Sequence, residues 1–158
     1  MQIRLDDLRG FEIAALLRAH LENSRKWSPP ESIHALDLEA LRSPEITFWT
    51  VWDGASLLGC GALKELDPSH GEIKSMHTAA DHRRRGVARA LLAHIVDEAR
   101  SRSYRRLSLE TGSMAGFAPA RALYAGFGFV GTAPFGDYIL DSNSVFMTLE
   151  LAPGPGPG

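Results

Sequence analysis

The sequence has little cysteine and no long apolar run. Cys60 is the only cysteine among 158 residues, which excludes an intrachain disulfide and a metal cage built from cysteines and fits a reducing compartment. No stretch approaches the roughly 18 apolar residues that span a bilayer. The start, Met1 to Asp7, becomes acidic too early for a signal peptide. These absences predict a soluble cytoplasmic protein.

A strong excess of one charge is also missing. Lysine and arginine number 17 against 19 aspartates and glutamates, a formal net charge of −2, whereas nucleic-acid-binding domains usually carry a clear basic excess. The six histidines lack the spacing of metal ligands on one helix face. We therefore predict no nucleic-acid partner, no membrane partner and no metal. The sequence does not decide whether the chain forms a homodimer.

What is present predicts one globular domain. Hydrophobic residues make up 44% of the chain and charged residues 23%, which is ordinary for a folded domain of this length. The six residues after Ala152 alternate proline and glycine, a composition that forms neither helix nor strand. We predict a domain over residues 1–151 and a flexible tail over 152–158.

Hydrophobic periodicity predicts the elements of this domain. Helices are expected at 8–25, from Ser28 to about Leu41, at 86–102 and at 118–126. Strands are expected at 3–5, 47–53, 57–66, 72–78, 106–111, 127–131 and 144–151. The order β-α-α-β-β-β-α-β-α-β-β is a mixed α/β (α+β) layout, with helices flanking a mostly antiparallel central sheet.

Four arginines crowd the start of the helix at 86–102. Arg83, Arg84, Arg85 and Arg89 lie within seven positions around Gly86. A helix start offers unpaired N–H groups and partial positive charge, so it attracts anions, and arginine there is unfavourable without one. Glycine lets a phosphate approach closely. The segment predicts an anion site, with an ordinary solvated basic loop as the alternative.

A family resemblance rests on this segment and its surroundings. Arg83-x-x-Gly86-x-Ala88 follows an apolar-rich strand and is followed by ALLAHIVDEAR, RRLSLETG and ALYAGFGFV. This order resembles the GNAT family of acyl-CoA-dependent N-acyltransferases over roughly residues 45–131. The resemblance implies the GNAT fold, acetyl-CoA as co-substrate, and direct attack by an amine without an acyl-enzyme. Cys60 is then no nucleophile and fills core space.

The resemblance also assigns the residues that hold CoA. It implies that the sheet opens between the strands at 72–78 and 106–111, and that pantetheine enters there like an added strand. A backbone N–H in this opening would polarise the thioester carbonyl. The residues implied for pantetheine are Met76, His77 and Thr78. Those implied for the pyrophosphate are Arg83, Arg84, Arg85, Gly86, Val87, Ala88 and Arg89.

Proton transfer requires an acid and a base. Tyr124 matches the family tyrosine that contacts CoA and protonates the departing thiolate, with a purely packing tyrosine as the alternative. Phe117 departs from the asparagine that many members carry seven residues earlier. For the base, Glu72 is the first candidate and Glu110 the second. Strand alternation is expected to place His77 on the opposite face from Glu72, Lys74 and Met76.

The sequence says less about the residues that contact the acceptor amine. In the family it lies against the first two helices and the last hairpin, which implies Trp27, Phe135 and Tyr138 as contacts. Asp137 or Asp141 is available for a cationic amine. The loop at 134–138 either closes over the site or is an ordinary turn cluster.

Three functions remain open from the sequence. The first is acetyl transfer to a primary amine of a small molecule or amino acid, the second acetylation of protein N-termini or lysines, and the third non-catalytic CoA binding. A fourth, dinucleotide binding, is suggested by Gly126-x-Gly128-x-x-Gly131. We reject it because the segment leaves a helix and enters a strand, the reverse of the required order.

Overall fold

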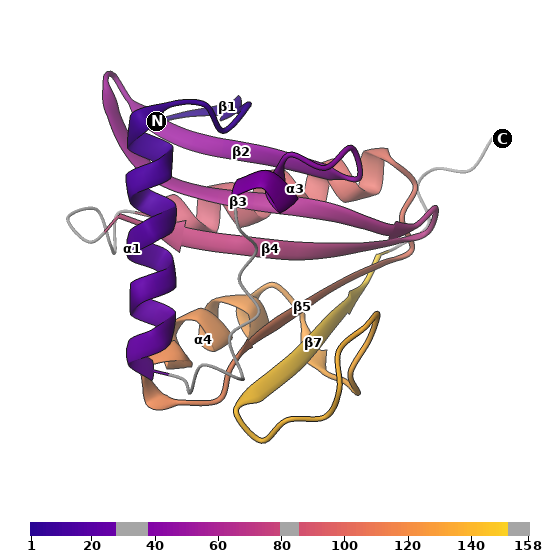
Figure 1. Ribbon diagram of the computed structural model, residues 1–158. Coiled ribbons are helices and arrows are strands. Elements are labelled where there is room, and N and C mark those ends of the chain that lie inside the picture. The colour runs from indigo at the N-terminus through magenta and orange to yellow at the C-terminus, as the bar shows by residue number, and fades with distance from the viewer. Residues whose placement is uncertain (28–37, 80–85, 152–158) are drawn as a thin grey trace, which may run out of the picture.

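The computed structural model describes residues 1–27, 38–79 and 86–151 (Figure 1). The predicted tail at 152–158, most of the second predicted helix and the arginines at 83–85 lie outside these residues. The order of strands and helices within them is the one predicted, which confirms the mixed α/β fold class.

One sheet of seven strands organises the described chain, in the order β1-β2-β3-β4-β5-β7-β6. All neighbouring strands are antiparallel except β4 and β5, which are parallel. The strands are β1 (Gln2–Leu5), β2 (Ile46–Asp53), β3 (Ser56–Asp67), β4 (His70–Thr78), β5 (Arg106–Gly112), β6 (Val130–Gly131) and β7 (Ser144–Glu150). The helices are α1 (Phe11–Trp27), α2 (Leu38–Leu41), α3 (Val87–Ser101) and α4 (Ala118–Gly126), with a short 3-10 turn at Ala115–Phe117.

Each face of the sheet is covered by its own helices. The α1 and α2 helices pack on one face through a smaller core that includes Ile13, Leu41 and Cys60. The α3 and α4 helices pack on the other face through a larger core that includes Leu91 and Tyr124. Figure 1 shows α1 crossing in front of the strands and α3 lying behind them. We call these faces the α1 face and the α3 face.

Two glycines of β3 let α3 approach the sheet. A Cβ atom at Gly61 would lie 2.6 Å from the Met76 sulfur and 3.0 Å from Leu91. A Cβ atom at Gly59 would lie 2.8 Å from the backbone oxygen of His77. Larger residues at either position would therefore push α3 or β4 away from β3.

A bulge interrupts the alternation of β4. Cys60 pairs with His77 but Ala62 pairs with Lys74, so a step of two residues along β3 corresponds to a step of three residues along β4. Ser75, within the bulge, has φ of 55°. Because directly paired residues share a face, His77 lies on the α1 face with Lys74, while Met76 contacts the α3 side. The predicted alternation, with Met76 beside Glu72 and His77 opposite, is therefore wrong.

The end of α4 explains why β6 is shorter than predicted. The amide of Gly128 donates to Ala125 O at 3.0 Å and the amide of Phe129 donates to Tyr124 O at 3.1 Å. Gly128 has φ of 101°, which suits glycine after a helix. The first residues of the predicted strand at 127–131 therefore terminate the helix, and the predicted helix stop and strand entry at the glycine triplet is confirmed.

Candidate active site

The sheet opens between its two parallel strands. Pairing between β4 and β5 ends at Ile73 and Leu109, although both strands continue. Beyond that point β4 stays paired with β3 as far as Thr78, and β5 stays paired with β7 as far as Gly112. Figure 1 shows β5 and β7 turning away from β4. We call the ends of these strands that do not pair with each other, residues 74–78 of β4 and 110–112 of β5, the splay; its position is the one predicted.

The first turn of α3 presents free amides beside Gly86. Gly86 has φ of 77°, and a Cβ atom there would meet nothing within 4 Å. The first bond of the helix runs from the Ala90 amide to Gly86 O, at 3.0 Å, so the amides of Val87, Ala88 and Arg89 precede the ladder. No acidic side chain lies in this turn. The arrangement suits an anion.

Arg89 is exposed, and its guanidinium lies 5.9 Å from the ring centroid of Phe127. This contact ties the first turn of α3 to the end of α4. The other three arginines of the predicted anion site lie outside the described residues, so their contribution stays a prediction.

A closed triangle of polar groups lies on the α1 face beside the splay. Lys74 Nζ donates to Glu72 Oε2 at 3.0 Å and to the Tyr138 hydroxyl at 2.9 Å, and that hydroxyl donates to Glu72 Oε2 at 2.6 Å. The side chains of Glu72 and Lys74 are only 3% and 9% exposed. Burial and the adjacent Glu72 charge raise the pKa of Tyr138 above its usual range, so its proton is retained.

Glu110 is the first residue of β5 beyond the stretch that pairs with β4. Its Oε2 accepts a hydrogen bond from Ser144 Oγ at 3.1 Å. Burial raises the pKa of Glu110 to about 7; the Ser144 hydrogen bond and the Lys74 charge oppose this rise, whereas the charges of Glu72 and Asp141 add to it. A carboxylate with this pKa can accept and release protons near neutral pH.

Tyr124 reaches the same region from α4. It is 7% exposed, and its ring packs against Phe129 at a centroid distance of 5.8 Å. Burial raises the pKa of Tyr124 and the charge of Glu110 raises it further, so the phenol stays protonated at neutral pH. The electrostatic effect shows that the two predicted proton-transfer groups lie near each other.

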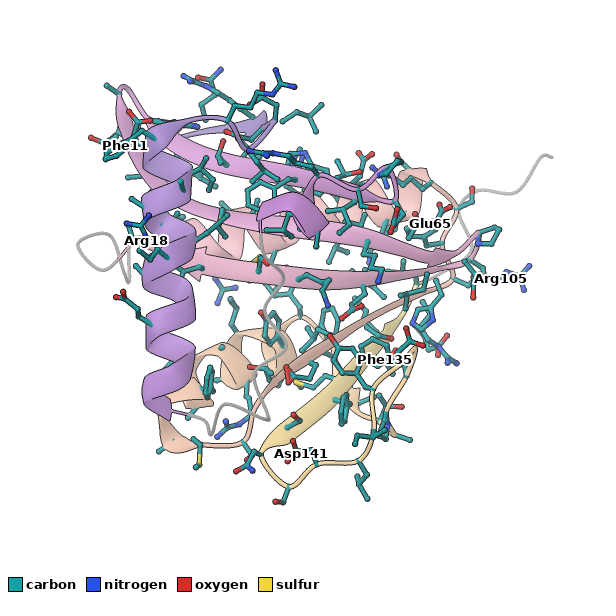
Figure 2. All side chains as sticks on the ribbon, viewed as in Figure 1. Phe11, Arg18, Glu65, Arg105, Phe135 and Asp141 are labelled. Atoms are coloured by element: carbon teal, nitrogen blue, oxygen red, sulfur yellow. The ribbon has the colours of Figure 1, made fainter. Side chains whose placement is uncertain are left out.

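The loop between β6 and β7 covers the α1 face of β5 and β7. The rings of Phe135, Tyr138 and Phe146 form a cluster with centroid distances of 5.1, 6.0 and 5.5 Å. Figure 2 shows Phe135 between the loop and β7, and Asp141 at the turn leading into β7. The sequence predicted Phe135 and Tyr138 at the site; the structure makes Tyr138 a member of the polar triangle and places Phe135 against the Tyr138 ring.

Other predicted residues are placed less directly. Trp27 ends α1, but its side chain lies outside the described part of the structure. The charge of Asp141 contributes to the raised pKa of Glu110, and Asp137 is exposed in the loop between β6 and β7. The sequence reasoning assigned no role to Lys74 or Ser144. The spacing of Glu72 and Lys74, two residues apart on one strand, could have indicated a role for Lys74. No local sequence pattern marks Ser144.

Cys60 is fully buried on the α1 face. Its thiol donates to Ser75 O at 3.3 Å, and burial raises its pKa above its usual range. A protonated thiol enclosed by core residues is a poor nucleophile. These contacts support the packing role expected for this residue.

Within residues 1–27, 38–79 and 86–151, no three His, Cys, Asp or Glu side chains gather where they could hold a metal ion. In the same part of the chain no helix combines the length and apolar character needed to cross a membrane.

Comparison with known proteins decides the family. The Acetyltransferase (GNAT) family matches residues 13–129, a stretch that contains the splay, the start of α3 and Tyr124. The chain belongs to the GNAT acetyltransferase family. It is accordingly an enzyme, an acetyl-CoA-dependent N-acyltransferase.

Several relatives align along most of this GNAT protein. YsnE of Bacillus subtilis (strain 168), described as an uncharacterized N-acetyltransferase, is 61% identical over 151 residues, covering 96% of this chain and 100% of that protein. YedL of Escherichia coli (strain K12), described in the same words, is 50% identical over 149 residues, 94% of each chain. An IAA acetyltransferase of Azospirillum brasilense is 39% identical over 124 residues, 78% of this chain and 80% of that one.

Solved structures share the fold. A protein assigned as an acyl-CoA N-acyltransferase from Klebsiella pneumoniae superposes with a TM-score of 0.76 at 26% identity, covering 96% of this chain and 97% of that one. A GNAT acetyltransferase from Elizabethkingia anophelis with acetyl-CoA bound gives 0.70 at 18% identity, covering 95% and 97%. A Bacillus subtilis acetyltransferase in complex with CoA gives 0.72 at 19% identity, covering 96% and 99%.

Proposed function

We propose that this GNAT protein transfers the acetyl group of acetyl-CoA to a primary amine of a small molecule by direct attack. The splay carries the proposal, because it separates the ends of two neighbouring strands that are each held by an outer partner, with Glu110 and Tyr124 near it. Solved neighbours with the same fold bind acetyl-CoA or CoA. The Azospirillum relative is named for IAA, which supports a small-molecule acceptor here.

The residues present fit acetyl-CoA. Met76, His77 and Thr78 lie at the end of β4 that no longer pairs with β5, where an extended pantetheine chain can lie along the strand. The amides that open α3, beginning beside Gly86, suit its pyrophosphate. Cys60 is buried, which is consistent with a reaction that forms no acyl-enzyme.

Glu110 is the stronger candidate for the base. An alkylammonium has a pKa near 10, and Glu110, with its pKa raised to about 7, accepts its proton more readily than an ordinary carboxylate does. Glu72 already accepts hydrogen bonds from both Lys74 and Tyr138. We therefore assign proton removal to Glu110 and loop anchoring to Glu72.

The proposed reaction transfers protons at Glu110 and at Tyr124. Glu110 takes one proton from the acceptor's ammonium group and later releases it to solvent. The free amine attacks the acetyl carbon, the C–S bond breaks, and the thiolate takes the phenol proton of Tyr124. The nitrogen loses its second proton as the amide forms, and this restores the phenol.

The direct test is thiol release from acetyl-CoA with panels of small amines, amino acids and peptides, with acetylated products identified by mass spectrometry. We expect turnover with small acceptors and a loss of about 100-fold or more in kcat/KM for Glu110→Gln. Glu150→Gln is the matched control, since this carboxylate is exposed at the far end of β7 and forms an ion pair with Arg106.

Three outcomes would contradict parts of the proposal. Turnover with peptides alone would favour acetylation of protein N-termini or lysines. Tight CoA binding without turnover of any acceptor would favour the non-catalytic module. Full activity of Glu110→Gln would show that Glu110 is not the base and would leave Glu72 as the candidate.

A further inference from the structure

Two opposite charges flank the point where β4 and β5 separate. The last paired residues are Ile73 and Leu109, so Lys74 and Glu110 are the first residues of the splay on either strand. Glu72 and Ser108 pair directly on the α1 face, and a step of two along each strand puts Lys74 and Glu110 on that face as well. An ammonium group and a carboxylate therefore border the start of the splay.

Lys74 is held in place by its neighbours. Its ammonium group donates to Glu72 and to the Tyr138 hydroxyl, and it lies 5.3 Å from the centroid of the Tyr138 ring. An ammonium group carries three donors, and within residues 1–27, 38–79 and 86–151 these two hydrogen bonds use two of them, so a third can bind an acceptor molecule. Burial of the side chain means that a further partner would meet little competition from water.

Glu110 provides the complementary half. The charge of Lys74 opposes the rise in the pKa of Glu110, as expected for side chains on the same face of adjacent strands. Neighbouring strands lie about 4.8 Å apart where pairing ends. The head groups of the two side chains are therefore within reach of the two ends of one small zwitterion.

We propose that the acceptor is an α-amino acid, whose ammonium group faces Glu110 while its carboxylate accepts a hydrogen bond from Lys74. This inference rests on the proposed function, because it names the acceptor of that same site. It gives Lys74 a role in specificity in addition to anchoring the loop through Tyr138. If Lys74 had only a structural role, its substitution would not change the preference for acceptors that carry a carboxylate.

The test compares acceptors that differ only in that carboxylate. Phenylalanine, phenylalanine amide and phenethylamine form one series, and leucine with leucine amide forms a second. Steady-state kinetics with acetyl-CoA should give the wild-type protein at least a tenfold higher kcat/KM for each free amino acid than for its amide. Equal or higher values for the amides would overturn the inference and leave the proposed function intact.

A variant assigns that preference to Lys74. The double substitution Glu72→Gln with Lys74→Met removes both charges, so that no buried carboxylate is left unpaired. We expect it to lose at least tenfold in the amino-acid-to-amide ratio, mainly through KM for the amino acid, while phenethylamine turnover changes less. Retention of the wild-type ratio by this variant would overturn the inference.

Two controls separate recognition from folding. Lys64→Met removes a lysine from β3 directly opposite Glu72 and should leave the ratio unchanged. Lys74→Arg keeps a cationic donor and should keep a preference for the carboxylate. The wild-type ratio is decisive by itself if the double variant does not fold. Absence of thiol release with every amine and amino acid would overturn the proposed function, and this inference with it.

Discussion

Removal of the Ser144 hydroxyl should move the pH profile of the enzyme to higher pH. Its hydrogen bond to Glu110 stabilises the ionised carboxylate and lowers its pKa, so Ser144→Ala should raise that pKa. A hydrogen bond to a charged group contributes about 1.5 kcal/mol or more, which corresponds to about one pH unit. The acid limb of kcat/KM should therefore shift upward from a midpoint of about 7 by about one pH unit or more.

The shift has a definite sign at each pH. The base must be ionised, so activity is present above the pKa of Glu110 and is lost as the pH falls through it. With a shift of about one unit, kcat/KM of Ser144→Ala at pH 6 should fall about tenfold relative to the wild type and be nearly equal at pH 9. The other charges acting on Glu110, those of Lys74, Glu72 and Asp141, are unchanged by the substitution.

The assay is initial-rate thiol release across pH 5.5–9.5 at low acceptor concentration, because kcat/KM reports the ionisation of the free enzyme. Ser113→Ala is the matched control, since that hydroxyl donates to Ser142 O instead of to a carboxylate. An unchanged midpoint in Ser144→Ala, or an acid limb that persists in Glu110→Gln, would refute Glu110 as the titrating base.

Three further substitutions test other parts of the structure. Tyr124→Phe should lower kcat by about 100-fold while acetyl-CoA affinity, measured by calorimetry, stays within about twofold; an unchanged kcat would exclude the acid role. Gly59→Ala should destabilise the protein by about 1–3 kcal/mol and weaken acetyl-CoA binding, because its Cβ would press on a backbone oxygen of β4; Gly126→Ala, with open space around it, should do neither. Lys74→Met alone should cost about 3–5 kcal/mol in denaturant unfolding by leaving Glu72 buried and unpaired, and a stability equal to the wild type would show that Glu72 is solvated or protonated.

The sequence predicted the order of elements because most of them are long and strongly periodic. The helix at 86–102 shows one apolar face, and the buried positions of α3 are those of that face. Local features such as the glycine after α4 were also readable, since helix termination depends on nearby residues. The position of the splay came from the family resemblance and not from periodicity.

The site depended on features that local patterns do not carry. A bulge at Ser75, a non-glycine residue with positive φ, reversed the faces of Met76 and His77. Tyr138 reaches Glu72 and Lys74 from more than sixty positions along the chain. The raised pKa of Glu110 arises from burial beneath a loop, which only the tertiary structure shows.

The separation of β4 and β5 also has a thermodynamic consequence. Each strand keeps its outer partner, so the opening is part of the native fold and needs no ligand to form it. A chain bound between the separated strand ends would contact both of them, and a ligand that binds only the folded state stabilises it by mass action. Saturation with CoA should therefore raise the melting temperature and slow amide hydrogen exchange at the end of β4, so that the ligand completes the sheet as a removable strand.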